Sequence, residues 1–473
     1  MMVLVDFPSV VHKYAPHFES CFSAAGYEHF KKALSGFMLS DNKSLEAINR
    51  MFVADSRDQS SFNKFFNRQN FDLSEVHAKR LSMLDSNKAT RFKFGKRQGV
   101  VSIDNSLLKH YGKCFDNIYY HYDYVQKCFR WSHDLVTLYY SDDQTDYPID
   151  YQLWLPPDWE AVAEFFREKD YTINQDKWDN RHQEPQKWRN YIRSRYRTGR
   201  KKHPEVVEVY KTKLHIGERL LRKFCEQYPD ADFPVALDSG YTSAEFCEII
   251  RKDFKKDYVG SLREDQTIFI KGEQTELKEL VAAIRADRTE GGGKFKVQKT
   301  GYPYRGKKQY AYTYFANYKV SKFDKKQRLV ISFLKEDLSD MPKFSITNRL
   351  DWYPSGILRI RRHRWPVETY HQEGKVEGLE KYQVRNDKAI QTYIAFVVVA
   401  FSMLKCTVHD DDLLSGIQQR LQTETDCTLP FLRRLLKAEG LLNIVEYVLE
   451  KINQGHELRE VFKPLARRIA YTQ

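Results

Sequence analysis

The sequence of 473 residues predicts an α/β fold in which a central sheet is flanked by helical regions at both ends of the chain. Three observations lead to this expectation. Residues 1–95 carry apolar side chains at three-to-four spacing, which is typical of helices. Short β-branched runs begin at Val100, which is typical of strands. From Arg361 onward the apolar positions again follow a helical period.

Composition favours a nucleic-acid partner. The chain has 77 Lys and Arg against 64 Asp and Glu, a formal net charge of +13. Many Tyr and Phe residues accompany this charge, although an anion or a membrane surface would attract it equally. The seven cysteines show no CxxC pair and no zinc-like spacing, which predicts buried thiols in a reducing compartment. With no signal-peptide pattern, and an apolar run (Tyr393 to Leu404) too short to span a bilayer, we expect a soluble, cytoplasmic protein.

The N-terminal region, residues 1–95, has the pattern of short helices joined by polar turns. Residues 44–52 have helical spacing, and Asp72-Leu73-Ser74-Glu75 resembles a capping box before an apolar helix over 76–84. We expect a DNA-binding domain here, with a plain helical bundle as the alternative.

The pattern changes to strands at Gly99. The β-branched run over residues 100–106 carries Asp104. Because turn residues separate the strand-like runs that follow, we expect consecutive antiparallel strands. These runs lie at residues 117–124, 134–140 and 148–155.

A dense basic run lies within the helical, charged segment that follows, residues 158–228. It begins with Lys187 and Arg189. Cations mixed with aromatic rings suit a phosphate backbone with bases or sugars beside it, whereas a solvated helix face is the alternative. We predict DNA contact by this run. Its other cations are Arg193, Arg195, Arg197, Arg200, Lys201 and Lys202, and its aromatic residues are Trp188, Tyr191 and Tyr196.

A second carboxylate, Asp238, ends a short apolar strand at residues 233–237. A helix over 244–254 and a strand over 258–262 are expected next. A carboxylate just past a core strand lies where α/β folds place their sites. A lone strand-end aspartate is nevertheless more often a turn former or a helix cap, so Asp238 needs partners to count as a site residue.

Residues 265–345 interrupt the alternation of strands and helices. Glycines at 291–293 mark a turn, and the strand-like runs around it are rich in Tyr, Phe and Lys, which predicts a β-rich insertion with a basic face. A buried helix is expected over residues 389–406, followed by amphipathic helices. The strand-like runs lie at 294–299, 309–320 and 328–334.

The stretch from Arg361 to Lys375 holds the third carboxylate. Arg364 and Glu368 are one helical turn apart, and Lys375 lies two turns further on, so we expect all three on one side of a helix. A carboxylate flanked by cations can bind a divalent metal and hold phosphate oxygens beside it. For this pattern alone, a solvated helix with ion pairs is the commoner explanation.

Together, Asp104, Asp238 and Glu368 come from a strand, a later strand and a helix. In the ribonuclease-H-like fold, adjacent central strands and a flanking helix bring three such carboxylates together. They repel one another unless cations neutralise them. Two Mg²⁺ ions roughly 3.5–4 Å apart would do so, and would clamp the attacking and leaving oxygens of a phosphoryl transfer.

These blocks resemble bacterial insertion-sequence transposases of the DDE class, and more narrowly the cut-and-paste group with a tyrosine–arginine–glutamate–lysine signature. Arg364, Glu368 and Lys375 fit its spacing, whereas the tyrosine position is Arg361 here. Residues 102–113 and 236–241 resemble the blocks around the two aspartates of the family, and residues 43–62 resemble its N-terminal helical segment.

The resemblance implies that Asp104, Asp238 and Glu368 bind two Mg²⁺ ions, for which Mn²⁺ substitutes. It implies that Arg361, Arg364 and Lys375 contact DNA phosphates. The implied enzyme is a transposase that binds the double-stranded ends of its own mobile element, cleaves them and joins the 3′-OH ends to target DNA, as a homodimer. Arg361 leaves open whether a DNA hairpin forms. The alternatives are an inactive or domesticated DNA-binding protein, and a ribonuclease-H-like nuclease that does not join strands.

The expected organisation has five parts. They are an N-terminal DNA-binding domain (1–95), the first part of a ribonuclease-H-like catalytic core (96–264), a β-rich insertion (265–345), the final core helices with Glu368 (346–405) and a C-terminal helical region that is the candidate for dimerisation (406–473).

Overall fold

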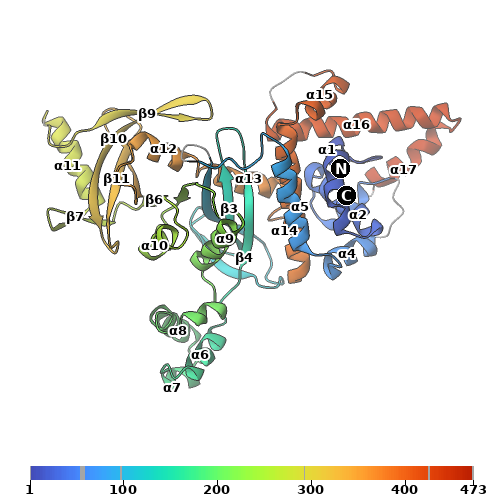
Figure 1. Ribbon diagram of the computed structural model, residues 1–473. Helices are drawn as coiled ribbons and strands as arrows, with labels where there is room; N and C mark the ends of the chain where they lie inside the picture. The colour runs from blue at the N-terminus through green and yellow to red at the C-terminus, as the bar shows by residue number, and fades with distance from the viewer. Residues whose placement is uncertain (1, 54–58, 96–98, 292, 424–426, 471–473) are drawn as a thin grey trace.

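The computed structural model describes residues 2–53, 59–95, 99–291, 293–423 and 427–470. Figure 1 shows a central sheet that continues on one side into the β-rich segment. A body of helices lies on the other side, and a small helical module projects from the centre. This mixed α/β architecture confirms the fold class at that level.

The centre of the sheet has the strand order β4-β3-β1-β5-β6. β1 pairs antiparallel with β3 and parallel with β5, which pairs parallel with β6. The parallel register of β1 and β5 ends at the pair Ile103–Leu237, so Asp104 and Asp238 follow side by side. The bounds are β1 (Val100–Lys109), β2 (Tyr119–Asp123), β3 (Cys128–Ser141), β4 (Asp146–Trp154), β5 (Val235–Leu237) and β6 (Tyr258–Leu262).

The β-rich segment extends this sheet, because β12 pairs antiparallel with β6 and passes the sheet on to β11 and β10. The sequence predicts a strand over residues 294–299. This prediction is wrong for residues 294–297, because β9 begins at Gln298. The elements are β7 (Thr267–Ile270), β8 (Glu273–Glu276), α11 (Leu277–Thr289), β9 (Gln298–Tyr304), β10 (Lys307–Val320), β11 (Lys326–Phe333) and β12 (Lys343–Thr347).

The helical body is built around α14 (Asp387–Val408). This helix is longer than the apolar run in the sequence, and by length and composition it is able to cross a membrane, but 89% of its apolar window is buried inside the protein. Phe396 at its centre packs against five phenylalanine rings from the N-terminal helices and the turns between them: Phe22, Phe30, Phe65, Phe66 and Phe71. Helices from both ends of the chain therefore share one core.

The helices around α14 come from both termini. They are α1 (Ser9–Tyr14), η1 (Ala15–Cys21), α2 (Ala24–Leu39), α3 (Leu45–Arg50), α4 (Gln59–Arg68) and α5 (Leu73–Ser86), and α15 (Asp411–Arg420), α16 (Leu429–Asn453) and α17 (Leu458–Ala470).

The projecting module has a hydrophobic core of its own, in which Trp188, Ile192 and Tyr196 pack against Val162 and Phe166. Trp188 and Tyr196 are therefore core residues and do not offer their rings to nucleic-acid bases. The module comprises α6 (Trp159–Glu168), α7 (Gln175–Asp179), α8 (Pro185–Gly199) and η2 (Pro204–Glu208), after which α9 (Lys213–Gln227) returns to the sheet.

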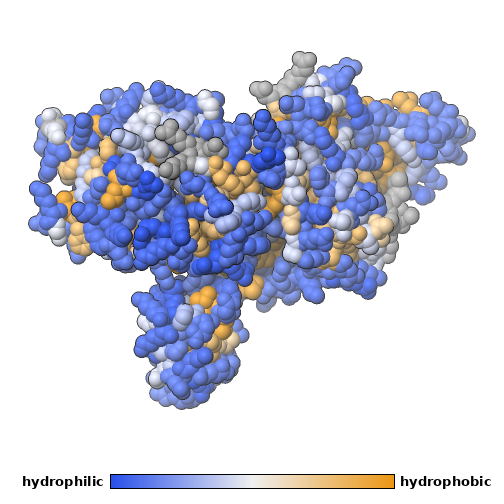
Figure 2. Space-filling model, viewed as in Figure 1, coloured by the Kyte–Doolittle hydropathy of each residue, from blue (hydrophilic) through white to orange (hydrophobic). Residues whose placement is uncertain are grey.

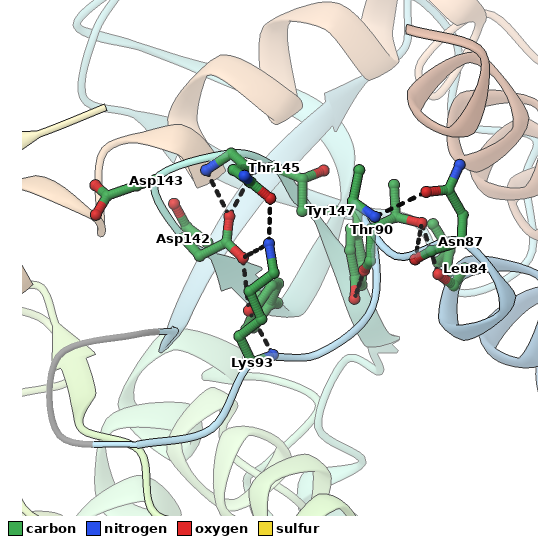
Figure 3. A network of polar contacts seen from close by, with 12 residues as sticks. Leu84, Asn87, Thr90, Lys93, Asp142, Asp143, Thr145 and Tyr147 are labelled. Carbon is green, nitrogen blue, oxygen red and sulfur yellow. Dashed lines mark hydrogen bonds and ion pairs between the residues drawn. The ribbon is translucent and has the colours of Figure 1, made fainter. Parts of the chain in front are cut away.

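The chain that enters β1 is fastened to the turn between β3 and β4 (Figure 3). The Lys93 ammonium lies 3.3 Å from the Asp142 carboxylate. The Tyr147 hydroxyl donates to the Thr90 carbonyl at 2.6 Å, and the Thr145 N–H donates to Asp142 at 2.6 Å. Because Asp142 is engaged on both sides, this turn is held firmly, and the next residue, Asp143, contacts Arg359 and His363.

Candidate active site

The three predicted carboxylates line one cavity of about 700 Å³. Asp104 comes from β1, Asp238 directly follows β5, and Glu368 lies in the first turn of α13 (Pro366–Glu377). The cavity thus gathers acidic side chains from two neighbouring strands and one helix. Its other lining residues are Ser239, Ser261, Leu262, Arg263, Glu264, Asp265, Met341, Pro342, Lys343, Phe344, Arg361 and Arg364.

Asp238 serves a structural role with one of its carboxylate oxygens. The backbone N–H groups of Gly240 and Tyr241 both donate to its Oδ1 at 2.9 Å. The turn-forming explanation is therefore correct for Oδ1. Within the described ranges no protein donor reaches Oδ2, which leaves that oxygen available to a ligand in the cavity.

Arg364 bridges the other two carboxylates. Its Nη1 lies 3.5 Å from Asp104 Oδ2, and its Nη2 forms an ion pair with Glu368 Oε1. Burial and the neighbouring charge of Asp238 raise the pKa of Asp104 to about 7, although Arg364 opposes this shift. At Asp104, burial and the charge of Asp238 therefore outweigh the stabilising effect of the Arg364 guanidinium.

The stretch from Arg361 to Lys375 forms two helices, so the prediction of a single helix is wrong. α12 (Pro354–Arg362) ends before Arg364, which lies in the turn that leads to α13. Pro366 at the first position of α13 explains the break, because proline lacks the N–H that a continuous helix would need there.

The turn between α12 and α13 is anchored by the buried His363. Its two ring nitrogens lie 3.0 Å from Ser141 Oγ and 3.2 Å from Asp143 Oδ1. Arg359 also donates to Asp143, at 3.2 Å. Burial and Arg359 lower the pKa of His363 to about 4, so the ring is neutral at pH 7 and donates to Asp143 through Nε2–H. The β3–β4 turn thereby positions Arg364 and Glu368.

The structure brings Arg361 to the cavity but not Lys375. Arg361 donates to Ser332 Oγ at 3.4 Å, and burial together with Arg364 lowers its pKa to about 10. Lys375 pairs instead with Glu380 at 3.4 Å. Seven residues of helix place it about 10 Å along α13 from Glu368, which explains why it does not line the cavity.

The predicted DNA-binding cations of the basic run lie in the projecting module, away from the cavity lining. Arg195 donates to the Thr172 carbonyl at 2.7 Å, and Arg200 pairs with Glu245 at 2.6 Å. These two are tied into the protein. The exposed ones are Lys187, Arg189, Arg193, Arg197, Lys201 and Lys202.

Sequence reasoning missed several cavity residues, notably Arg263, Glu264 and Asp265, which directly follow β6. The signal was present, because β6 is parallel to β5 and its carboxyl end meets the same edge of the sheet. The approach of Lys343 had no sequence signal, since it depends on the pairing of β12 with β6.

The carboxylates of the cavity are of the right chemical type to bind a hard divalent cation, because carboxylate oxygens are the ligands that Mg²⁺ and Mn²⁺ prefer. As arranged here, no group of three His, Cys, Asp or Glu side chains among the described residues is positioned to hold a metal ion. Asp104 and Glu368 instead form ion pairs with the Arg364 guanidinium. A metal would therefore need that arginine to move.

A family model described as "DDE superfamily endonuclease" matches residues 17–318. The match covers more than half of the chain, which therefore belongs to this family of DNA-acting nucleases and transposase-type enzymes. Family members generally use divalent metal ions. Asp104 and Asp238 lie inside the matched range, and Glu368 lies beyond it. No curated protein matches the chain.

The raised pKa of Asp104 predicts a pH-dependent cost to stability. Folded Asp104 has a pKa of about 7 against a reference value of 3.8, so the folded state binds the proton more firmly. The stability of the metal-free protein should therefore fall as pH rises from 4 to 7. Asp104→Asn should remove this fall and stabilise the protein at pH 8 by up to about 4 kcal/mol.

Urea unfolding in a chelator at several pH values measures this effect. The exposed Asp324→Asn serves as the control. Parallel curves for wild type and Asp104→Asn would show that Asp104 carries no such cost.

Proposed function

We propose that this chain is a cut-and-paste DNA transposase, which cleaves the ends of its own mobile element by metal-dependent phosphoryl transfer and joins the 3′-OH ends to target DNA. The observation that carries the proposal is the shared cavity of Asp104, Asp238 and Glu368, with Arg361 and Arg364 beside them. Cytoplasmic action on double-stranded DNA follows from this function.

The strand order supports a ribonuclease-H-like core. Three antiparallel strands, β4, β3 and β1, are followed by two strands parallel to β1. This order makes β1 and β5 neighbours, so the pairing of the two strands itself places two of the carboxylates next to each other. α13 adds the third from its first turn, and it packs against β1.

In this mechanism Asp104, Asp238 and Glu368 would hold the divalent ions, two Mg²⁺ or Mn²⁺. When bound, these ions supply a more nucleophilic attacking oxygen and neutralise charge on the leaving oxygen. Arg361 and Arg364 bind non-bridging phosphate oxygens and align the scissile phosphate for in-line attack. Arg364 thus exchanges its carboxylate partners for phosphate.

Membership of the group with the tyrosine–arginine–glutamate–lysine signature is part of the proposal. Arg361 stands at the tyrosine position and lines the cavity, where its guanidinium offers phosphate a charged, bidentate partner. Lys375 would touch DNA only where the strand runs on along α13, because the lysine lies outside the cavity lining.

A homodimer is supported by an apolar stripe on α16. Leu441, Val445, Leu449 and Ile452 are exposed at three-to-four spacing along this helix, part of which is hydrophobic in Figure 2. Such a stripe is typical of helices that pair.

We expect Val445→Glu with Leu449→Glu to convert the dimer to monomer in analytical ultracentrifugation. A monomeric wild type, or an unchanged dimer in the variant, would rule out this surface.

Glu368→Gln should abolish metal-dependent cleavage of element ends while DNA affinity stays within about twofold. The change removes one carboxylate charge from the cavity and keeps the shape of the side chain. Gel assays with Mg²⁺ or Mn²⁺ measure cleavage, and fluorescence anisotropy measures binding. Glu264→Gln is the matched control, because Glu264 lines the same cavity but is not a proposed ligand. Full cleavage by Glu368→Gln would contradict the assignment of Glu368 as a metal-binding carboxylate.

One observation favours an inactive DNA-binding protein, namely the described carboxylates that do not converge on a metal position. A joining assay with pre-cleaved ends, read together with the gel assay of cleavage, separates this alternative and a plain nuclease from a transposase. We expect wild type to insert labelled 3′-OH ends into a target plasmid. Cleavage without joining would identify a nuclease, and neither activity would identify the inactive protein.

A further inference from the structure

Charge is sorted between the helices of the projecting module. Residues 185–203, which form α8 and the turn after it, contain eight Lys or Arg and no Asp or Glu. Residues 158–184, which contain α6 and α7, hold eight Asp or Glu against four Lys or Arg. A module of this size therefore presents one strongly cationic helix, and Figure 2 shows the module as mostly hydrophilic on the face in view.

Four of these cations form a ridge. Arg189, Arg193, Arg197 and Lys201 follow one another at intervals of four residues, and all are exposed. Within the part of the chain that the structure describes, their side chains make no hydrogen bond or ion pair. The neighbouring Arg195 and Arg200 are held by protein partners, as described above. The ridge thus carries four cations of the basic run that no carboxylate of the described residues neutralises.

The ridge leads into a second cavity, of about 600 Å³, which Lys201 lines. The exposed Lys322, Lys325 and Lys326 face this cavity from the start of β11 and the turn before it. The cavity lies along α10 (Ala244–Lys252).

Two of the three carboxylates in this second cavity are neutralised by the protein. Arg200 pairs with Glu245 at 2.6 Å, and Arg251 pairs with Glu248 at 2.5 Å. Asp324 is the third. Four lysines against one remaining carboxylate leave the cavity cationic, so ridge and cavity form one continuous positive tract.

We propose that this tract, from Arg189 to Lys326, binds the sugar-phosphate backbone of duplex DNA outside the catalytic cavity. The inference rests on DNA being the substrate, as proposed above. Arg189, Arg193 and Arg197 lie about 6 Å apart along α8, close to twice the 3.4 Å rise between phosphates of one strand. Single strands are bound chiefly by stacking on exposed aromatic rings. Trp188 and Tyr196 are buried, which favours the duplex.

The test replaces Arg189, Arg193, Arg197 and Lys201 together by Gln. A matched control removes four cations from α17, at the far side of the helical body (Figure 1): Arg459, Lys463, Arg467 and Arg468, each to Gln. Both variants lose the same net charge. Circular dichroism checks folding, which exposed substitutions should leave intact.

Binding of a 30-base-pair duplex is measured by anisotropy from 50 to 300 mM salt, with a chelator present. The ridge variant should bind at least tenfold more weakly at 150 mM salt, and the slope of log K against log salt should shrink by about 3.6, because each of the four lost phosphate contacts removes about 0.9. The control should keep the wild-type slope. Equal losses in both variants, or none in the ridge variant, would overturn the proposal.

A single-stranded oligonucleotide of the same length distinguishes the ligand. The ridge variant should lose less affinity for it than for the duplex, and an equal or larger loss would contradict duplex recognition. Because no metal is present, these results do not depend on cleavage or joining. A negative result for the ridge variant therefore does not change how the Glu368→Gln test is interpreted.

Discussion

The three carboxylates that we propose as metal ligands share one cavity in this protein, and a cation has to balance their repulsion. Arg364 provides that balance by pairing with Asp104 and Glu368, yet Asp104 keeps a raised pKa. Burial, and then the charge of Asp238, disfavours the ionised form of Asp104, so a further cation beside it would be stabilising. A divalent ion would supply that charge, and it would free Arg364 for a phosphate. Metal and DNA are thus expected to assemble the site together.

The rest of the fold holds these charges in register. The parallel pairing of β1 with β5 makes Asp104 and Asp238 adjacent. The β3–β4 turn reaches the third element, because Asp143 binds both His363 and Arg359 beside Arg364. The same turn is fastened through Asp142 to Lys93. The position of Glu368 therefore depends on contacts made by chain segments far apart in sequence.

Much of the site could be predicted from the sequence, because it depends on local patterns. A strand-like run predicted Asp104, which lies in the middle of β1, a strand-end position predicted Asp238, and spacing predicted Glu368 with Arg364; all four line the cavity. The break at Pro366 was readable in principle, yet the position of Lys375 was not, since it depends on the direction of α13. The basic run gave no indication that Trp188 and Tyr196 point inward, because core packing and base stacking use the same residue types. The strands that extend the sheet past β6 depend on long-range pairing.

The most direct test of the central claim is anomalous diffraction from crystals grown with Mn²⁺ and an element-end duplex. The account predicts manganese within ligand distance, about 2.0–2.3 Å, of oxygens from Asp104, Asp238 and Glu368, with Arg364 moved from Asp104 onto a phosphate. Manganese bound elsewhere, or Arg364 still paired with Asp104 and Glu368 in a complex whose DNA lies in the cavity, would contradict it.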